Sequence, residues 1–418
     1  MKRLILLATL LPLLTTTIAQ TRLRPGDIII TGFNSTDPDV FTFVPLVDLA
    51  VGTPICFTDN GWHTTNGFRK TEGILNYTAP VGGVKAGTVV HYYPDAPNFN
   101  KSNNLFLLSM DGDQLISYQI YDEDNELADP NMGGVAYFTK FVFALTFKKP
   151  WGEAISSNTS AIPPGLKAGE TALELGNYRN FQYKVSAKRQ GQLHVLLRDV
   201  CNPNNWFGSN GLLTMDTTPF SLSKMMPGDV ALIAVNASVV GLQDFAFTAL
   251  KQIPAGTEMF FTDNGWNGYL GFRKGEGTLL YTVPQGGLSP GKVVVYRDNK
   301  QDFKASGNFN LEMKDQLLVY EGLESHPSFI FGLCYGTGWQ ENANSNSTSV
   351  RPHLLVDGIN AVALADKPNQ VFDQCLATDL DNRLASICQP GNWKDEGAIQ
   401  LNLALRLSPC VTGMSGCE

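Results

Sequence analysis

The chain has 418 residues, of which 43% are hydrophobic and 17% charged, and its formal net charge is −8 at pH 7. This excess of acidic residues argues against binding to nucleic acid or to an anionic membrane surface. The 40 Gly and 23 Pro residues indicate a globular protein that is rich in turns.

The first residues predict a secretory signal peptide. Lys2 and Arg3 form a basic start, and residues 4–14 form an apolar stretch that is too short to cross a bilayer. Thr17-Ile18-Ala19 provides a small-residue cleavage site. We therefore expect residues 1–19 to be removed and the mature protein to be secreted and extracellular, with no membrane span.

The remainder of the chain contains the same pattern twice. Residues 57–62 read Phe-Thr-Asp-Asn-Gly-Trp and recur at 261–266, and 16 of the 24 positions from residue 57 to residue 80 are identical 204 residues later. Pro-Gly-Asp opens both copies. Each copy has the length of one globular domain, which predicts repeat domains over residues 20–223 and 224–418.

Short β-branched or aromatic segments bounded by Gly, Pro, Asn or Asp predict strands in chain order. In the first copy they cover residues 27–31, 40–44, 54–58, 89–93 and 115–118. In the second copy they cover residues 230–235, 245–250, 258–261, 293–296 and 317–320. Helical spacing appears at residues 190–200 and 380–387, and each segment stops at Cys-x-Pro. The predicted fold is mainly β, with two tandem antiparallel β-sandwich-like domains and one short helix near the C-terminal end of each.

The repeated Asp-Asn-Gly after the third strand has two interpretations. Asp and Asn favour tight turns, which gives Asp59 and Asp263 a structural role. The alternative makes both carboxylates calcium ligands, although calcium prefers six to eight oxygen ligands and no calcium-binding motif is present. We favour the turn and otherwise predict no cofactor.

Three further residues recur in the same register and define a speculative ligand site. Arg69 and Glu72 of the first copy correspond to Arg273 and Glu276 of the second. They indicate either an ion pair or loop-carbonyl contacts, or recognition of a glycan or an acidic ligand. Trp62 and Trp266 belong to the core in the first interpretation and stack on a sugar in the second.

Two features fit an extracellular protein. Six Asn-x-Ser/Thr sequons are candidate glycosylation sites: Asn34, Asn76, Asn100, Asn158, Asn236 and Asn346. Seven Cys residues in an oxidising compartment suggest disulfides, of which Cys375–Cys388 and Cys410–Cys417 are the local candidates.

Catalysis finds little support in the pattern. None of the five His residues recurs between the copies, and the chain contains no zinc-protease or nucleophile-elbow motif. A hydrolase with a pair of carboxylates that meet only in space is the remaining enzymatic alternative.

The ordered motifs resemble a secreted domain of unknown function. They are Pro-Gly-Asp before a strand, Phe-Thr-Asp-Asn-Gly-Trp, Asp-Gln-Leu at residues 113–115, and Asn-Trp after the helix. The domain occurs mainly in bacterial surface and exported proteins, and the resemblance implies no catalytic residue. We therefore expect a non-enzymatic structural, adhesive or matrix-type binding protein whose candidate partners are matrix or surface components, glycans included. A tandem carbohydrate-binding module, with or without calcium dependence, is the alternative, followed by a secreted hydrolase.

Overall fold

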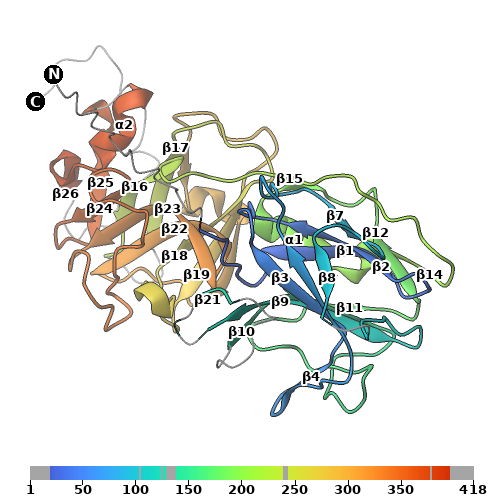
Figure 1. Cartoon of the computed structure of the whole chain (residues 1–418). Helices are drawn as coiled ribbons and strands as arrows, with labels where there is room; N and C mark the ends of the chain where they lie inside the picture. The colour runs from blue at the N-terminus through green and yellow to red at the C-terminus, as the bar shows by residue number, and fades with distance from the viewer. Residues whose placement is uncertain are drawn as a thin grey trace, which may run out of the picture. The chain divides into compact units, whose positions relative to one another are not determined.

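The computed structural model describes residues 19–102, 105–122, 124, 126–128, 138–238, 243–376 and 379–395, and it forms two compact units (Figure 1). Unit 1 comprises the described residues up to Arg189 together with Leu197–Leu222. Unit 2 comprises Gln190–Leu196 together with the described residues from Ser223 onward. The predicted signal peptide lies outside the described residues except for Ala19. No helix among the described residues is long and apolar enough to span a membrane.

Unit 1 contains a five-stranded sheet and a six-stranded sheet. The first has the order β14 (Trp206–Ser209), β12 (Asn180–Tyr183), β1 (Ile28–Asn34), β2 (Val40–Pro45) and β7 (Val90–Tyr92). The second has the order β11 (Ala172–Leu175), β10 (Phe138–Phe147), β9 (Asp113–Tyr121), β3 (Pro54–Thr58), β6 (Ile74–Thr78) and β8 (Phe99–Lys101). Shorter elements are β4 (Trp62–His63), β5 (Gly67–Phe68), β13 (Gln190–Gly191), β15 (Ser221–Leu222), η1 (Pro203–Asn205) and α1 (Leu193–Val200), of which β13 and the start of α1 group with unit 2.

Unit 2 repeats this order strand for strand. Its five-stranded sheet runs β26 (Trp393–Asp395), β25 (Asn369–Phe372), β16 (Val230–Asn236), β17 (Asp244–Ala249) and β20 (Val293–Val295). Its six-stranded sheet runs β24 (Ala361–Leu364), β23 (His326–Tyr335), β22 (Asp315–Leu323), β18 (Glu258–Thr262), β19 (Gly277–Thr282) and β21 (Phe303–Gly307). The helical elements are α2 (Leu380–Ile387), η2 (Gly268–Leu270), η3 (Arg297–Asp302), η4 (Gln374–Leu376) and η5 (Pro390–Asn392).

Aromatic side chains join the two sheets of each unit. In unit 1 the ring centroid of Phe57 on β3 lies 4.9 Å from those of Phe41 and Phe43 on β2. In unit 2 Phe261 on β18 takes the same position, 4.9 Å from Phe247 on β17. Because side chains alternate along a strand, these residues supply one face of each sheet to a shared core.

The predicted fold class is confirmed: both units are mainly β, both are sandwich-like, and each copy has one short α-helix near its end. One detail differs from a purely antiparallel sheet. β10 pairs with β11 in parallel, and β23 pairs with β24 in parallel. A parallel pair needs a long crossover connection, and residues 148–171 and 336–360 provide it.

The crossover connections and the loop after β3 cover a second apolar layer on the opposite face of the six-stranded sheet. In unit 1 this layer contains Cys56, Tyr118 and Phe141, with Trp62 and Phe68 packed against it. Cys56 and Phe57 point to opposite faces of β3, as neighbours on a strand must. The Asp-Asn-Gly-Trp motif is therefore held between the sheet and the loops that cover it.

Candidate functional site

Asp59 follows directly after β3 and is fully buried. Its Oδ1 accepts the N–H of Gly73 at 2.8 Å, and its Oδ2 accepts the N–H of Leu107 at 2.7 Å. A Cβ at Gly73 would lie 2.0 Å from the backbone nitrogen of Phe106, so only glycine fits there. One carboxylate thus binds two separate loops to the end of the strand.

Asp263 makes the same contacts in unit 2. Its Oδ1 accepts the N–H of Gly277 at 2.9 Å, and its Oδ2 accepts the N–H of Asn310 at 2.6 Å. A Cβ at Gly277 would lie 2.1 Å from the nitrogen of Phe309. These donors occupy the oxygens that the calcium interpretation needs, and the described residues contain no group of three or more His, Cys, Asp or Glu placed to hold a metal ion.

We call the hydrogen bonds of Asp59, and those of Asp263, to two loops the clamp of each unit. Asn60 and Asn264 add further hydrogen bonds to it, and sequence reasoning did not single them out. The Asn60 Oδ1 accepts the N–H groups of Thr71 and Glu72, each at 3.0 Å, and its Nδ2 donates to the carbonyl oxygen of Gly73 at 3.1 Å. The Nδ2 of Asn264 donates to the carbonyl oxygen of Gly277 at 2.9 Å. Both side chains close the loop that carries the Arg and Glu of the speculative ligand site.

A buried glutamine connects the clamp to the crossover loop. The Gln114 Nε2 lies 2.8 Å from the Asp113 Oδ1 and 2.8 Å from the Ser157 carbonyl oxygen, and it also donates to the Asp59 carbonyl oxygen. These contacts recur in unit 2, where Gln316 takes the place of Gln114. The recurrence of Asp-Gln-Leu in the sequence was the signal that could have identified this side chain.

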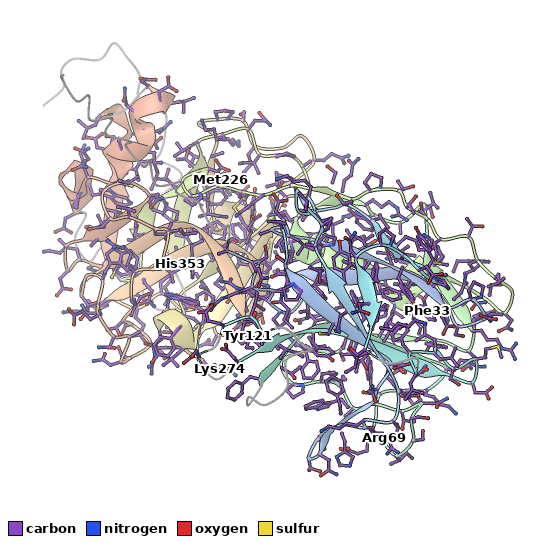
Figure 2. All side chains as sticks on the ribbon, in the orientation of Figure 1. Phe33, Arg69, Tyr121, Met226, Lys274 and His353 are labelled. Atoms are coloured by element: carbon purple, nitrogen blue, oxygen red, sulfur yellow. The ribbon has the colours of Figure 1, made fainter. Side chains whose placement is uncertain are left out.

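Arg69 lies on the loop near β4 (Figure 2) and binds a loop carbonyl. Its Nη1 donates to the carbonyl oxygen of Ala154 at 2.7 Å, and the Arg273 Nη1 donates to that of Ala343 at 2.9 Å. The two guanidinium groups therefore hold the crossover loops in place, as the loop-carbonyl interpretation expects. This arrangement does not require a ligand.

Glu72 is half-buried, and the pKa of its carboxyl is strongly raised. Burial, together with the charge of Asp59, raises its pKa to about 8, against the opposing effect of Arg69. Burial, together with Asp263, likewise raises the pKa of Glu276 to about 8. Three carboxylates that recur in the sequence thus lie close enough to interact in each unit, since Asp113 also feels the charges of Glu72 and Asp59.

The two Trp rings pack against aromatic neighbours. The Trp62 ring lies 4.8 Å from that of Phe141 in an edge-to-face arrangement, and the Trp266 ring lies 4.9 Å from that of Phe329 in the same way. Trp266 is only 9% exposed, whereas Trp62 is half-buried. Both belong to the second apolar layer, in agreement with the core interpretation.

The predicted Cys375–Cys388 disulfide is wrong. Cys388 carries a free thiol, and Cys56, Cys201 and Cys334 likewise form no disulfide. It lies at the end of α2 inside the main apolar cluster of unit 2, where burial raises its pKa to about 12. Cys410 and Cys417 lie outside the described residues.

The six sequons differ in accessibility. Asn34, Asn76 and Asn236 are buried, and the Asn34 Nδ2 donates to the carbonyl oxygen of Leu213 at 2.9 Å. Asn100 on β8 is exposed, and the other two, Asn158 and Asn346, are half-buried. Because a glycan is attached at Nδ2, only exposed side chains have room for one in this fold. Glycosylation stays a prediction, with Asn100 as its best-placed site.

No protein-family model, no curated protein and no solved structure matches the chain.

The clamp predicts a stability effect at the aspartates. Asp59→Ala and Asp263→Ala each leave two backbone N–H groups without an acceptor, and each unsatisfied buried donor costs about 1–3 kcal/mol. Chemical denaturation of the full chain should show a loss of this order for each variant. Adding calcium or a chelator should leave the wild-type transition unchanged; a chelator-sensitive transition that Asp59→Ala abolishes would restore the calcium interpretation.

The Trp rings should differ in their contribution to stability. Trp266→Ala should cost about 3–5 kcal/mol, as truncation of a buried aromatic residue does, and Trp62→Ala should cost less because its ring is more exposed. Thermal melts measure both changes, and the exposed Phe207→Ala is the matched control. Melts that stay at the wild-type temperature, together with lost glycan binding, would favour the sugar-stacking interpretation.

The raised pKa values of Glu72 and Glu276 predict that stability falls as pH rises. A carboxyl whose pKa is higher in the folded than in the unfolded state stabilises the fold while it is protonated, and this contribution disappears as the pH rises through the folded pKa. The melting temperature should therefore fall between about pH 5 and pH 9. Glu72→Gln and Glu276→Gln should each reduce this fall, whereas the exposed Glu341→Gln should not; equal slopes for all variants would contradict the assignment.

Proposed function

We propose that the chain is a secreted, non-enzymatic binding protein of structural, adhesive or matrix type. The observation that supports this most strongly is how the repeated polar residues are used. The side chains of Asp59, Gln114 and Arg69 form hydrogen bonds with backbone atoms of loops in unit 1. Their counterparts form the equivalent hydrogen bonds in unit 2. The polar side chains that recur in both units thus hold the loops in place, and we call this framework the scaffold.

The loop tips that this scaffold supports are the candidate binding surfaces. The tip between Trp62 and Gly67 reads His-Thr-Thr-Asn, and the tip between Trp266 and Gly271 reads Asn-Gly-Tyr-Leu. Tyr269 in the second tip is 96% exposed. Different exposed side chains on matching loops suit two units that contact different matrix or surface components, glycans included.

The hydrolase alternative rests on one specific observation. The carboxyl of Glu72 has a pKa raised to about 8 beside Asp59, and glycosidases use a carboxylic acid with a raised pKa as the general acid. Burial raises the pKa of Glu276 to the same value, so burial within the scaffold accounts for the raised pKa in both copies without a catalytic role.

A binding assay with a turnover readout separates these functions. The full chain is incubated with immobilised matrix polysaccharides and matrix proteins, and both the retained protein and the released reducing ends are measured. We expect retention on at least one component without release, and retention that is unchanged in Glu72→Gln. Release of reducing ends that Glu72→Gln abolishes would establish the hydrolase, and no retention on any component would overturn the proposed function.

A further inference from the structure

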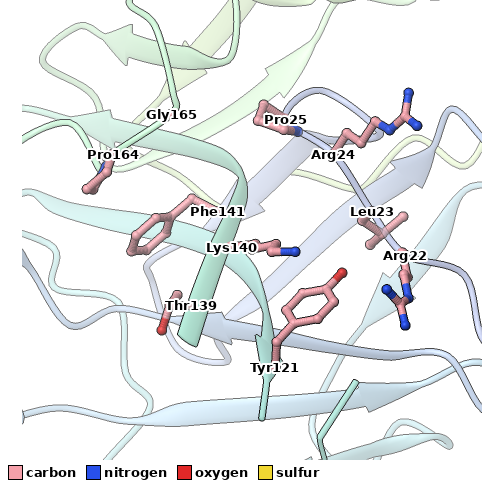
Figure 3. Close-up of a pocket in the computed structure, with 10 residues that line it drawn as sticks. All are labelled: Arg22, Leu23, Arg24, Pro25, Tyr121, Thr139, Lys140, Phe141, Pro164 and Gly165. Atoms are coloured by element: carbon pink, nitrogen blue, oxygen red, sulfur yellow. The ribbon is translucent and has the colours of Figure 1, made fainter. Parts of the chain in front are cut away.

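Unit 1 contains a pocket of about 520 Å³ that sequence reasoning did not identify (Figure 3). The segment before β1, the facing ends of β9 and β10, and the crossover loop form its walls. Its lining residues are Arg22, Leu23, Arg24, Pro25, Tyr121, Thr139, Lys140, Phe141, Pro164 and Gly165. The volume falls in the range of pockets that hold small ligands.

Three of the lining side chains are cationic, on a chain whose net charge is −8. The Lys140 Nζ lies 4.0 Å from the centroid of the Tyr121 ring, a cation–π contact. Burial and the neighbouring Arg22 both lower the pKa of Lys140, as expected where cations gather. Arg22 pairs with Glu126 at 2.5 Å, whereas the exposed Arg24 guanidinium has no hydrogen-bond or ion-pair partner among the described residues.

The rest of the wall is apolar or aromatic. Leu23, Phe141 and the Tyr121 ring are buried on the protein side, and Pro25 and Pro164 add rigid apolar surface. Lys140 projects from β10 over the Tyr121 ring (Figure 3). A ligand therefore meets positive charge beside the accessible apolar surface of Pro25 and Pro164, which suits an anionic group on a compact body with C–H faces.

The second copy provides an internal comparison. The β9–β10 register pairs Asp113 with Phe147, and the β22–β23 register pairs Asp315 with Tyr335. Counting along these strands places Leu323 at the position of Tyr121 and Ser328 at that of Lys140. Counting back from Pro-Gly-Asp places Met226 at the position of Arg24. Arg22 and Phe141 keep a cation and an aromatic ring in unit 2, as Lys224 and Phe329, whereas Arg24, Tyr121 and Lys140 are specific to unit 1.

We propose that this pocket binds an acidic saccharide, with a carboxylate or sulfate group held by Lys140 and Arg24 and the sugar ring against Pro25 and Pro164. The inference rests on the proposed function, because it names the ligand class of an extracellular binding protein. Carboxylate and sulfate share the chemistry that these cations recognise. A uronic acid and a sulfated sugar are the two sources.

Calorimetric titration of the full chain tests the proposal. The probes are digalacturonate for the carboxylate, a heparin-derived disaccharide for the sulfate, and cellobiose as the neutral sugar. We expect at least one acidic probe to bind, with an affinity that falls as salt rises, and cellobiose not to bind. The acidic probe with the higher affinity identifies the source; binding of cellobiose with equal affinity, or of neither acidic probe, would overturn the proposal.

Variants locate the binding. Lys140→Met and Arg24→Gln should each lower the affinity for the acidic probe by about tenfold, because each removes one charge-assisted contact. Lys304→Gln removes a charge from an exposed position on β21 of unit 2 and should leave the affinity unchanged. Because Arg24 is exposed, Arg24→Gln should leave the fold intact, and it therefore tests the pocket even if Lys140→Met is destabilised. If Lys140→Met is folded, unchanged affinity in both variants would refute the site. If Lys140→Met is unfolded, unchanged affinity in Arg24→Gln alone would refute it. Retention on matrix components that persists without binding of the acidic probes would refute the pocket and leave the proposed function standing.

Discussion

A buried carboxylate at the end of a strand organises each unit. Asp59 and Asp263 each accept backbone N–H groups from two loops that lie far apart in the sequence, so a single side chain fixes the path of both loops. Burying a carboxyl is costly unless such donors are present, and burial still raises the pKa of Asp59 to about 7 and that of Asp263 to about 6. The glycine donors, the amide side chains and the loop-binding arginines are arranged around this constraint.

The same constraint explains why the motif resembles a ligand site in sequence. The repeated Asp, Trp, Arg and Glu lie within fourteen residues, which would suit a binding or catalytic site, but Asp59, Trp62 and Arg69 each have a local structural partner. Arg69 binds a carbonyl of the crossover loop, and Trp62 packs on Phe141. The features that differ between the copies, namely the loop tips and the cationic pocket of unit 1, are better guides to what the protein contacts.

Much of the fold followed from the sequence, because the repeat marks equivalent strands and Gly, Pro and Asn mark their ends. The helix over residues 380–387 has the predicted bounds, and α1 begins only three residues after the predicted start. The ten-residue strand β10 was not predicted, since its apolar residues form a nearly continuous run without clear alternation. The clamp partners and the thiol of Cys388 depend on contacts between distant segments, which spacing alone does not show. The pocket likewise depends on Arg22 and Lys140 meeting in space.

The base of the hairpin after β3 has a further consequence. The N–H of Arg69 donates to the carbonyl oxygen of Gly61 at 3.0 Å, and the N–H of Arg273 donates to that of Gly265 at 2.8 Å, so both hairpins close at the same point. Beyond that point the two tips have diverged at all four positions while the base kept its geometry. The fold thus already tolerates unrelated tetrapeptides on one frame, and foreign recognition sequences could be grafted there without rebuilding the sandwich.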